Sequence, residues 1–160
     1  MSKTYWLKPI GLPEKKIEIG GFSDFQEQIH FPVNPGSVKK DDRMFLHAVG
    51  HFRLVGLFQV SSEVKMFTQE ERDKSGFEWR RDFPYYVESQ NLFKLFSDHW
   101  YDMNLNPNLM DDQFTKETGS NVTPTNDSID AIQYGKSHIR LTAEFAQYLF
   151  DSMKVQDIKL

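Results

Sequence analysis

Residues 43–60 read RMFLHAVGHFRLVGLFQV, and this stretch decides the fold class. Two apolar runs flank a short turn that contains Gly50, which is typical of an antiparallel β-hairpin. Each run contains a pair of adjacent apolar residues, Phe45-Leu46 in the first and Leu54-Val55 in the second. Adjacent residues of a strand point to opposite faces, so both faces are expected to be buried. The hairpin is therefore predicted to lie centrally in a sheet or barrel.

The chain before the hairpin predicts one further strand. Residues 4–10 (TYWLKPI) combine aromatic and branched side chains, and the turn signal Gly11-Leu12-Pro13 ends the run. Residues 14–37 are broken by glycine and proline and are predicted to be irregular, although Ser23 is placed to cap a short helix.

Directly after the hairpin, residues 61–76 are charged and are expected to form a loop or a short helix. Residues 77–88 (FEWRRDFPYYVE) are predicted to form a strand, in which Pro84 requires a bulge or an edge position. A helix is expected to follow from 92 to 100.

The last part of the chain predicts a strand followed by a helix. Residues 138–141 carry the strand pattern, and Thr142 is placed to cap a helix over 143–153. Apolar residues recur every four positions along this helix, so it should present one face to the core.

An acidic segment interrupts an otherwise mildly basic chain. Residues 98–130 contain seven acidic residues and one lysine, which leaves +2 for the rest of a chain whose net charge is −4. Within it, residues 104–128 are polar and poor in apolar side chains, so they are predicted to form a long acidic loop. A mildly basic body is compatible with a phosphate-bearing partner.

Composition favours one domain, spanning 1–160, without disulfides. The chain has 160 residues, 14 phenylalanines and no cysteine, which predicts a phenylalanine-rich core and a reducing compartment. The sequence carries no apolar run of signal-peptide or membrane-spanning length, so a cytoplasmic location with no membrane contact is expected. A glycine-rich phosphate loop, a nucleophile elbow and a Glu-x-x-His pair are all missing from the sequence, and no cofactor is expected.

Five short motifs occur in a recognisable order along the chain. They are the opening strand Tyr5-Trp6-Leu7-Lys8-Pro9, the step Lys39-Lys40-Asp41-Asp42-Arg43 into a buried strand, its partner 54–60, the pair Trp79-Arg80, and Arg140-Leu141-Thr142 before a helix. Together they resemble the PUA-like superfamily, in particular its EVE and YTH-like branches. The step that usually reads Gly-Asp in this family reads Asp41-Asp42 here. The resemblance implies an α+β fold: a PUA-like mixed β-barrel or sheet with flanking helices.

The resemblance also implies a function, namely the binding of DNA or RNA with one base, commonly a modified one, taken out of the stack. Unstacking a base costs a few kcal/mol, which stacking on aromatic walls offsets. Trp79 is similar in position to a cage tryptophan of YTH-like domains, and the end of the first strand lines the pocket in those relatives. The predicted base pocket therefore consists of Trp79, Lys8, Pro9 and Ile10, with Phe22 or Phe25 as a second wall.

Basic residues near these motifs are candidates for contacts to phosphates. They are Lys39, Lys40, Arg43, Arg53, Arg80 and Arg81. They would form one phosphate-binding surface only if the hairpin and the segment around Trp79 share a face. Acidic residues interleave with them, so a solvated salt-bridged face is the alternative.

Three other functions are weighed against base binding. His47 and His51 are four residues apart but span the hairpin turn and have no third ligand at suitable spacing, so no metal site is predicted. The ASCH type of PUA-like domain resembles small hydrolases of modified nucleosides, in which Lys8 or Lys39 with Glu63 would be the counterparts. An interaction domain that binds a protein partner through the acidic segment 98–130 is the third alternative.

Overall fold

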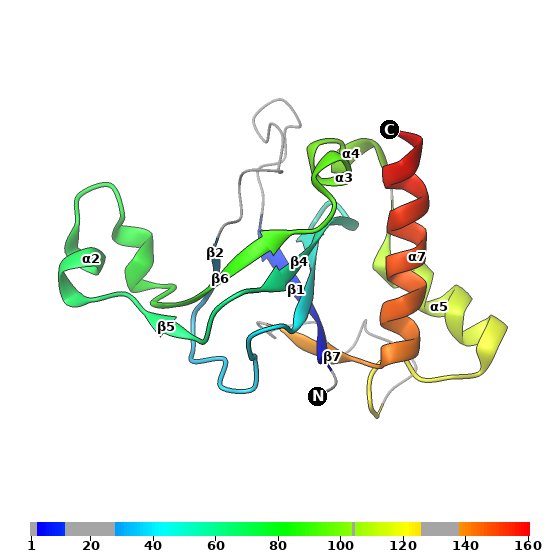
Figure 1. Ribbon diagram of the computed structural model, residues 1–160, viewed down its shortest axis with the longest axis horizontal. Coiled ribbons are helices and arrows are strands. Elements are labelled where there is room, and N and C mark those ends of the chain that lie inside the picture. The colour runs from blue at the N-terminus through cyan, green and yellow to red at the C-terminus, as the bar shows by residue number, and fades with distance from the viewer. Residues whose placement is uncertain (1–2, 12–27, 104, 126–137) are drawn as a thin grey trace.

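The computed structural model describes residues 3–11, 28–103, 105–125 and 138–160, which build a curled mixed sheet with helices on its flank (Figure 1). The strands run in the order β2-β6-β4-β3-β1-β7. All pairs are antiparallel except β1 with β3, which are parallel. The strands are β1 (Tyr5–Gly11), β2 (Gln28–Phe31), β3 (Arg43–Val49), β4 (Arg53–Val60), β6 (Tyr85–Asn91) and β7 (Ile139–Leu141). The predicted α+β class, a mixed sheet with flanking helices, is confirmed.

The β3–β4 hairpin occupies the centre of the sheet, as its apolar pairs predict. Phe45, Leu46, Leu54 and Val55 are all fully buried, so both faces of each strand are covered. The close packing extends to Gly56 of β4, where an added Cβ would collide with the hydroxyl of Ser97 and with the ring of Phe58. The largest fully buried side chains include Trp100 and five phenylalanines, so the predicted phenylalanine-rich core is present.

Helix α7 (Ala143–Lys159) covers one side of the sheet together with α5 (Pro107–Thr118), α3 (Lys94–Asp98) and α4 (Trp100–Met103) (Figure 1). The hydroxyl of Thr142 accepts a hydrogen bond from the Phe145 backbone N–H, which confirms the predicted cap. Phe145, Leu149 and Met153 are buried at the predicted spacing of four. No helix in the described ranges is long and apolar enough to span a bilayer.

The prediction of an acidic loop over 104–128 is wrong for Pro107–Thr118, which form the helix α5. The Asn106 side chain caps this helix by accepting from the Asn108 N–H at 2.9 Å, Pro107 takes the first turn, and Gly119 ends it at φ 68°. Phe114 anchors α5 in the core. Capping at both ends and the burial of Phe114 thus stabilise α5 as a helix, although its composition is polar.

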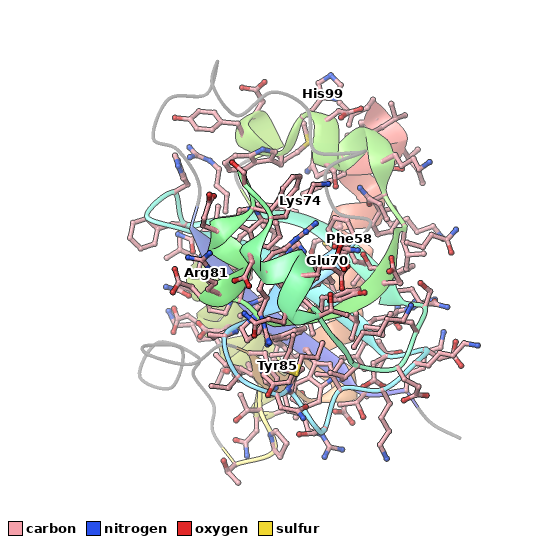
Figure 2. All side chains as sticks on the ribbon, turned by 90° about the vertical axis from the view of Figure 1, so that its left-hand side faces the viewer. Phe58, Glu70, Lys74, Arg81, Tyr85 and His99 are labelled. Atoms are coloured by element: carbon pink, nitrogen blue, oxygen red, sulfur yellow. The ribbon has the colours of Figure 1, made fainter. Side chains whose placement is uncertain are left out.

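Residues 61–84 form an arm that projects from the sheet between β4 and β6 (Figures 1 and 2). The arm holds the two-residue strand β5 (Lys65–Met66), which pairs with β6, the helix α2 (Gln69–Asp73) and the 3₁₀-helix η1 (Glu78–Arg81). The prediction of a strand over 77–88 is wrong for residues 77–84, because β6 begins only after Pro84. Backbone bonds from Arg80 to Phe77 and from Phe83 to Trp79 replace the strand ladder there. The strand β2 lies in the segment predicted to be irregular.

Candidate nucleic-acid interface

The end of β1, the strand β2 and the arm meet around a pocket of about 290 Å³. Its lining comprises Lys8, Pro9, Ile10, Ile29, His30, Trp79 and Phe83. The structure therefore brings together four of the residues predicted from sequence, Lys8, Pro9, Ile10 and Trp79. Sequence reasoning missed Ile29, His30 and Phe83. The other two predicted wall residues, Phe22 and Phe25, lie outside the described residues.

Trp79 forms an open aromatic wall of the pocket. Its side chain is 40 % exposed, whereas Trp6 and Trp100 are buried. The edge of the His30 ring packs against Trp79 at 4.6 Å between centroids, and Phe67 lies behind at 5.9 Å. Phe67 in turn stacks on Tyr86 of β6 at 4.4 Å. The indole is thus held by a chain of rings anchored in the sheet while one part of it stays accessible.

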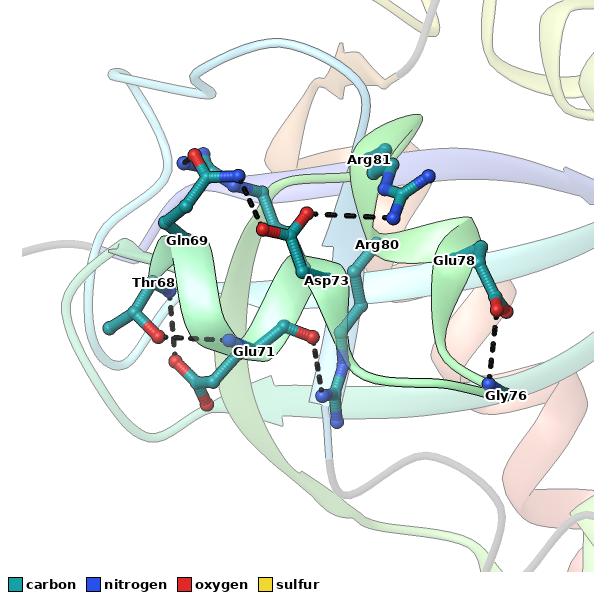
Figure 3. A network of polar contacts seen from close by, with 9 residues as sticks. Thr68, Gln69, Glu71, Asp73, Gly76, Glu78, Arg80 and Arg81 are labelled. Carbon is teal, nitrogen blue, oxygen red and sulfur yellow. Dashed lines mark hydrogen bonds and ion pairs between the residues drawn. The ribbon is translucent and has the colours of Figure 1, made fainter.

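Arg80 fixes η1 against α2, beside Trp79. Its guanidinium lies 4.2 Å from the Phe77 ring centroid and 4.7 Å from that of Phe67, and it donates a hydrogen bond to the Glu71 carbonyl at 3.1 Å (Figure 3). Next to it, Arg81 pairs with Asp73 at 3.5 Å, with both side chains half exposed. Stacking and hydrogen bonding of this kind position Trp79, so Arg80 acts as a structural support of the pocket wall.

The polar groups of the pocket are Lys8 and His30. Lys8 is 5 % exposed, its ammonium lies 4.8 Å from the Phe31 ring centroid, and burial lowers its pKa to about 8. Burial, and then the charges of Lys8 and Arg80, lower the pKa of His30 to about 4. At neutral pH the pocket therefore holds a cationic lysine and a neutral imidazole, which suit a ligand with hydrogen-bond acceptors and no positive charge.

Lys39 and Lys40 line a different cavity, of about 500 Å³, at the beginning of β1. Its other basic residues are Lys3 and Arg140, and its acidic residues are Asp41 and Asp42. Asp42 is buried, and its carboxylate accepts hydrogen bonds from the Thr4 N–H at 3.1 Å, the Trp6 indole N–H at 3.0 Å and the Lys39 N–H at 3.0 Å. We call this site the cationic cavity.

The remaining predicted phosphate contacts do not join either cavity. Arg43 and Arg53 lie toward opposite ends of the hairpin, because Arg43 pairs with Gln59 and Arg53 with Ala48 in the strand register. The Arg43 guanidinium lies 5.8 Å from the ring of Phe150 in α7. That of Arg53 lies 4.6 Å from the ring of Tyr101 in α4. The six predicted basic residues therefore do not line one common cavity among those described.

The residues considered for the alternative functions lie at separate places in the described structure. The lining of the Lys8 pocket contains no carboxylate among them, and Glu63 is exposed on the arm. Lys39 lines the other cavity. His51 packs edge-on against Trp100 and Tyr101, and within the described ranges no three metal-ligating side chains gather. In the acidic segment, Asp111 is buried and Asp112 pairs with Lys116, which reduces the charge available to a protein partner.

No protein-family model matches the chain, and no curated protein is significantly similar to it in sequence. Solved structures are similar in fold. Human THYN1 in complex with DNA containing 5-methylcytosine superposes with a TM-score of 0.54 at 15 % identity, covering 95 % of this chain and 98 % of the other. A hypothetical protein from Leishmania major gives 0.59 at 10 % identity, covering 97 % of each chain.

The third similar structure is the YTH domain of Zygosaccharomyces rouxii MRB1 in complex with N6-methyladenosine RNA. It has a TM-score of 0.53 at 8 % identity, and the match covers 95 % of this chain and 87 % of that one. At such identities the likeness concerns the backbone architecture. The sheet order, the flanking helices and these superpositions together show that the chain shares the fold of THYN1 and of the YTH domain, which is the fold that the resemblance to the PUA-like superfamily implied.

Proposed function

We propose that the protein binds a nucleic acid and takes one base, carrying a methyl group, into the pocket between Lys8 and Trp79. The observation that carries this proposal is the pocket itself. An accessible indole, held by rings behind it, faces a volume whose other walls are Pro9, Ile10, Ile29 and Phe83.

The chemistry of the walls fits a neutral methylated base. A base stacked on an aromatic side chain gains about 1–3 kcal/mol, which offsets an unstacking cost of a few kcal/mol. The ammonium of Lys8 can donate to a ring nitrogen or carbonyl, whereas a methyl group is accommodated by the apolar walls. The cation also disfavours a positively charged base, because like charges would face each other in a buried site.

The similar folds support the same class of ligand. Both THYN1 and the YTH domain of MRB1 were solved with a nucleic acid that carries a methylated base, DNA in one case and RNA in the other. The choice between DNA and RNA, and between cytosine and adenine, is open to direct measurement for this chain.

Tryptophan fluorescence offers the first test, because Trp79 is the exposed one of the three tryptophans. The panel contains DNA and RNA oligonucleotides, single and double stranded, with and without 5-methylcytosine or N6-methyladenine, at low and moderate salt. We expect quenching that is selective for one methylated base. Absence of quenching by every oligonucleotide at low salt would contradict the proposal.

Variants of Trp79 then assign the pocket. Trp79→Ala should weaken binding of a fluorescently labelled oligonucleotide at least tenfold, because a stacking surface is lost, while Trp79→Phe should retain most of the affinity. Thermal unfolding checks that both variants fold. Equal affinity of Trp79→Ala and the wild type would place the base elsewhere.

A further inference from the structure

The cationic cavity and the base pocket open along the same face of β1. Side chains two residues apart lie on one face of a strand, and Trp6 lines the cationic cavity whereas Lys8 lines the base pocket. His138 connects them, because its ring packs edge-on against Trp6 at 5.0 Å and against Phe31 at 5.4 Å, and the Lys8 charge acts on it. The two sites thus lie next to each other along β1, with His138 between them.

The basic side chains of the cationic cavity are available to an anion. Four of them line it, Lys3, Lys39, Lys40 and Arg140, and none forms an ion pair with a described carboxylate. The charge of Asp42 is compensated within the cavity wall, because its oxygens accept hydrogen bonds from three N–H donors. Asp42 therefore connects the turn at Lys39 to β1 through hydrogen bonds. The lysine side chains of the cavity are exposed to solvent.

The spacing of the two sites matches a strand of nucleic acid. From Thr4 to Lys8 the chain advances four residues, or about 13 Å at the rise of a β-strand. Successive phosphates of a stacked strand advance about 3.4 Å along its axis, so the two sites are about four nucleotide steps apart, and fewer when the strand is extended.

We propose that the cationic cavity binds the phosphodiester backbone of the same strand whose base enters the Trp79 pocket, two to four nucleotides away from that base. This inference rests on the proposed function. It predicts that short ligands occupy the base pocket alone, whereas longer strands engage both sites and bind with a steeper salt dependence.

The test compares ligands of different length on the double variant Lys39→Glu, Lys40→Glu. The probes are the nucleosides 5-methyl-2′-deoxycytidine and N6-methyladenosine, oligonucleotides of two and eight nucleotides containing the same bases, and inorganic tripolyphosphate. We expect unchanged nucleoside affinity, at least tenfold weaker binding of the eight-nucleotide strand, and a smaller slope of log K against log salt, by about 1.4 for two lost single-strand phosphate contacts. Because each change removes a side chain only, the backbone bond from Lys39 to Asp42 is kept.

A charge-matched control separates a local contact from a change in net charge. Lys94→Glu with Lys154→Glu alters two exposed lysines of α3 and α7, and should leave the affinity for the eight-nucleotide strand within about twofold of the wild type.

The possible outcomes distinguish the backbone contact at the cationic cavity from the base pocket at Trp79. An unchanged salt slope in the Lys39, Lys40 variant, with a Trp79-dependent nucleoside still bound, would overturn the cationic cavity and leave the base pocket standing. Tripolyphosphate binding that the variant abolishes, without oligonucleotide binding, would identify a free polyphosphate site and overturn the backbone assignment. Failure of every probe to bind would overturn both proposals.

Discussion

A buried charged group lies near each end of β1, and the surroundings of the two groups differ. At the beginning of the strand, buried Asp42 accepts three N–H donors, which compensate its charge. At its end, buried Lys8 lies against an aromatic ring and near two histidines, and its pKa is lowered. Three donated hydrogen bonds favour the charged form of Asp42, whereas burial disfavours the charged form of Lys8.

The compensated end is tested by Asp42→Asn, for which we expect the largest effect. The amide would place an N–H₂ group opposite N–H donors, so a favourable contact becomes unsatisfied or repulsive in a buried site. The free energy of unfolding, measured by urea denaturation at pH 7, should fall by about 3 kcal/mol. The control is Asp112→Asn on the exposed face of α5, which should change it by less than about 0.5 kcal/mol. Similar losses in the free energy of unfolding for both variants would contradict a stabilising role of the Asp42 hydrogen bonds.

The other end is tested by Lys8→Met, which keeps the length of the side chain and removes its charge. Burial lowers the pKa of Lys8 from 10.5 to about 8, so the penalty for its charge is complete below pH 8 and disappears as pH rises toward 10.5. The variant should therefore be more stable than the wild type by about 2–3 kcal/mol at pH 7.

This stability difference should shrink when the same urea titrations are repeated at pH 9.5, and the variant should bind the methylated oligonucleotide less tightly. A gain in stability that does not depend on pH would instead point to better packing of the methionine. The pKa of His30 provides a second measure by NMR: it should rise from about 4 in the variant, because the Lys8 charge contributes to lowering it.

The smallest change in the free energy of unfolding is expected from a substitution of Asp41, next to Asp42. Asp41 adopts φ 77°, a left-handed conformation that glycine adopts without steric cost. The family that the sequence resembles is expected to carry glycine at this position, which suits the same conformation. Asp41→Gly should raise the free energy of unfolding by about 0.5–1 kcal/mol, and it also removes a negative charge from the cationic cavity. Destabilisation in the same urea assay would show that the aspartate side chain has a stabilising contact.

Sequence patterns predicted the parts of the fold in which local and global preferences agree. The hairpin at Phe45 and Leu54, the strand at Lys8 and the helix capped by Thr142 all carry strong periodic or capping signals. The convergence of Lys8 and Trp79 on one pocket was predicted from the family resemblance, not from spacing.

The errors have identifiable causes. The four residues of β2 were missed because their pairing with β6 is non-local, and with them His30 and Ile29 of the pocket. The aromatic content around Trp79 mimics a strand, but those rings pack on one another and on Arg80 in a 3₁₀ turn. Helix α5 was hidden by its polar composition, although Asn106-Pro107 and Gly119 are readable start and stop signals.

The position of the arm has an evolutionary consequence. Strands β4 and β6 pair directly, Val60 with Ser89, and Met66 of β5 pairs with Tyr85 of β6, so residues 67–84 leave the sheet and return beside the point of departure. A segment inserted between adjacent paired strands can lengthen, shorten or be replaced at a modest entropic cost, without shifting the strand register. Since this segment supplies Trp79 and Phe83, the wall of the pocket can change while the paired strands of the sheet keep their register.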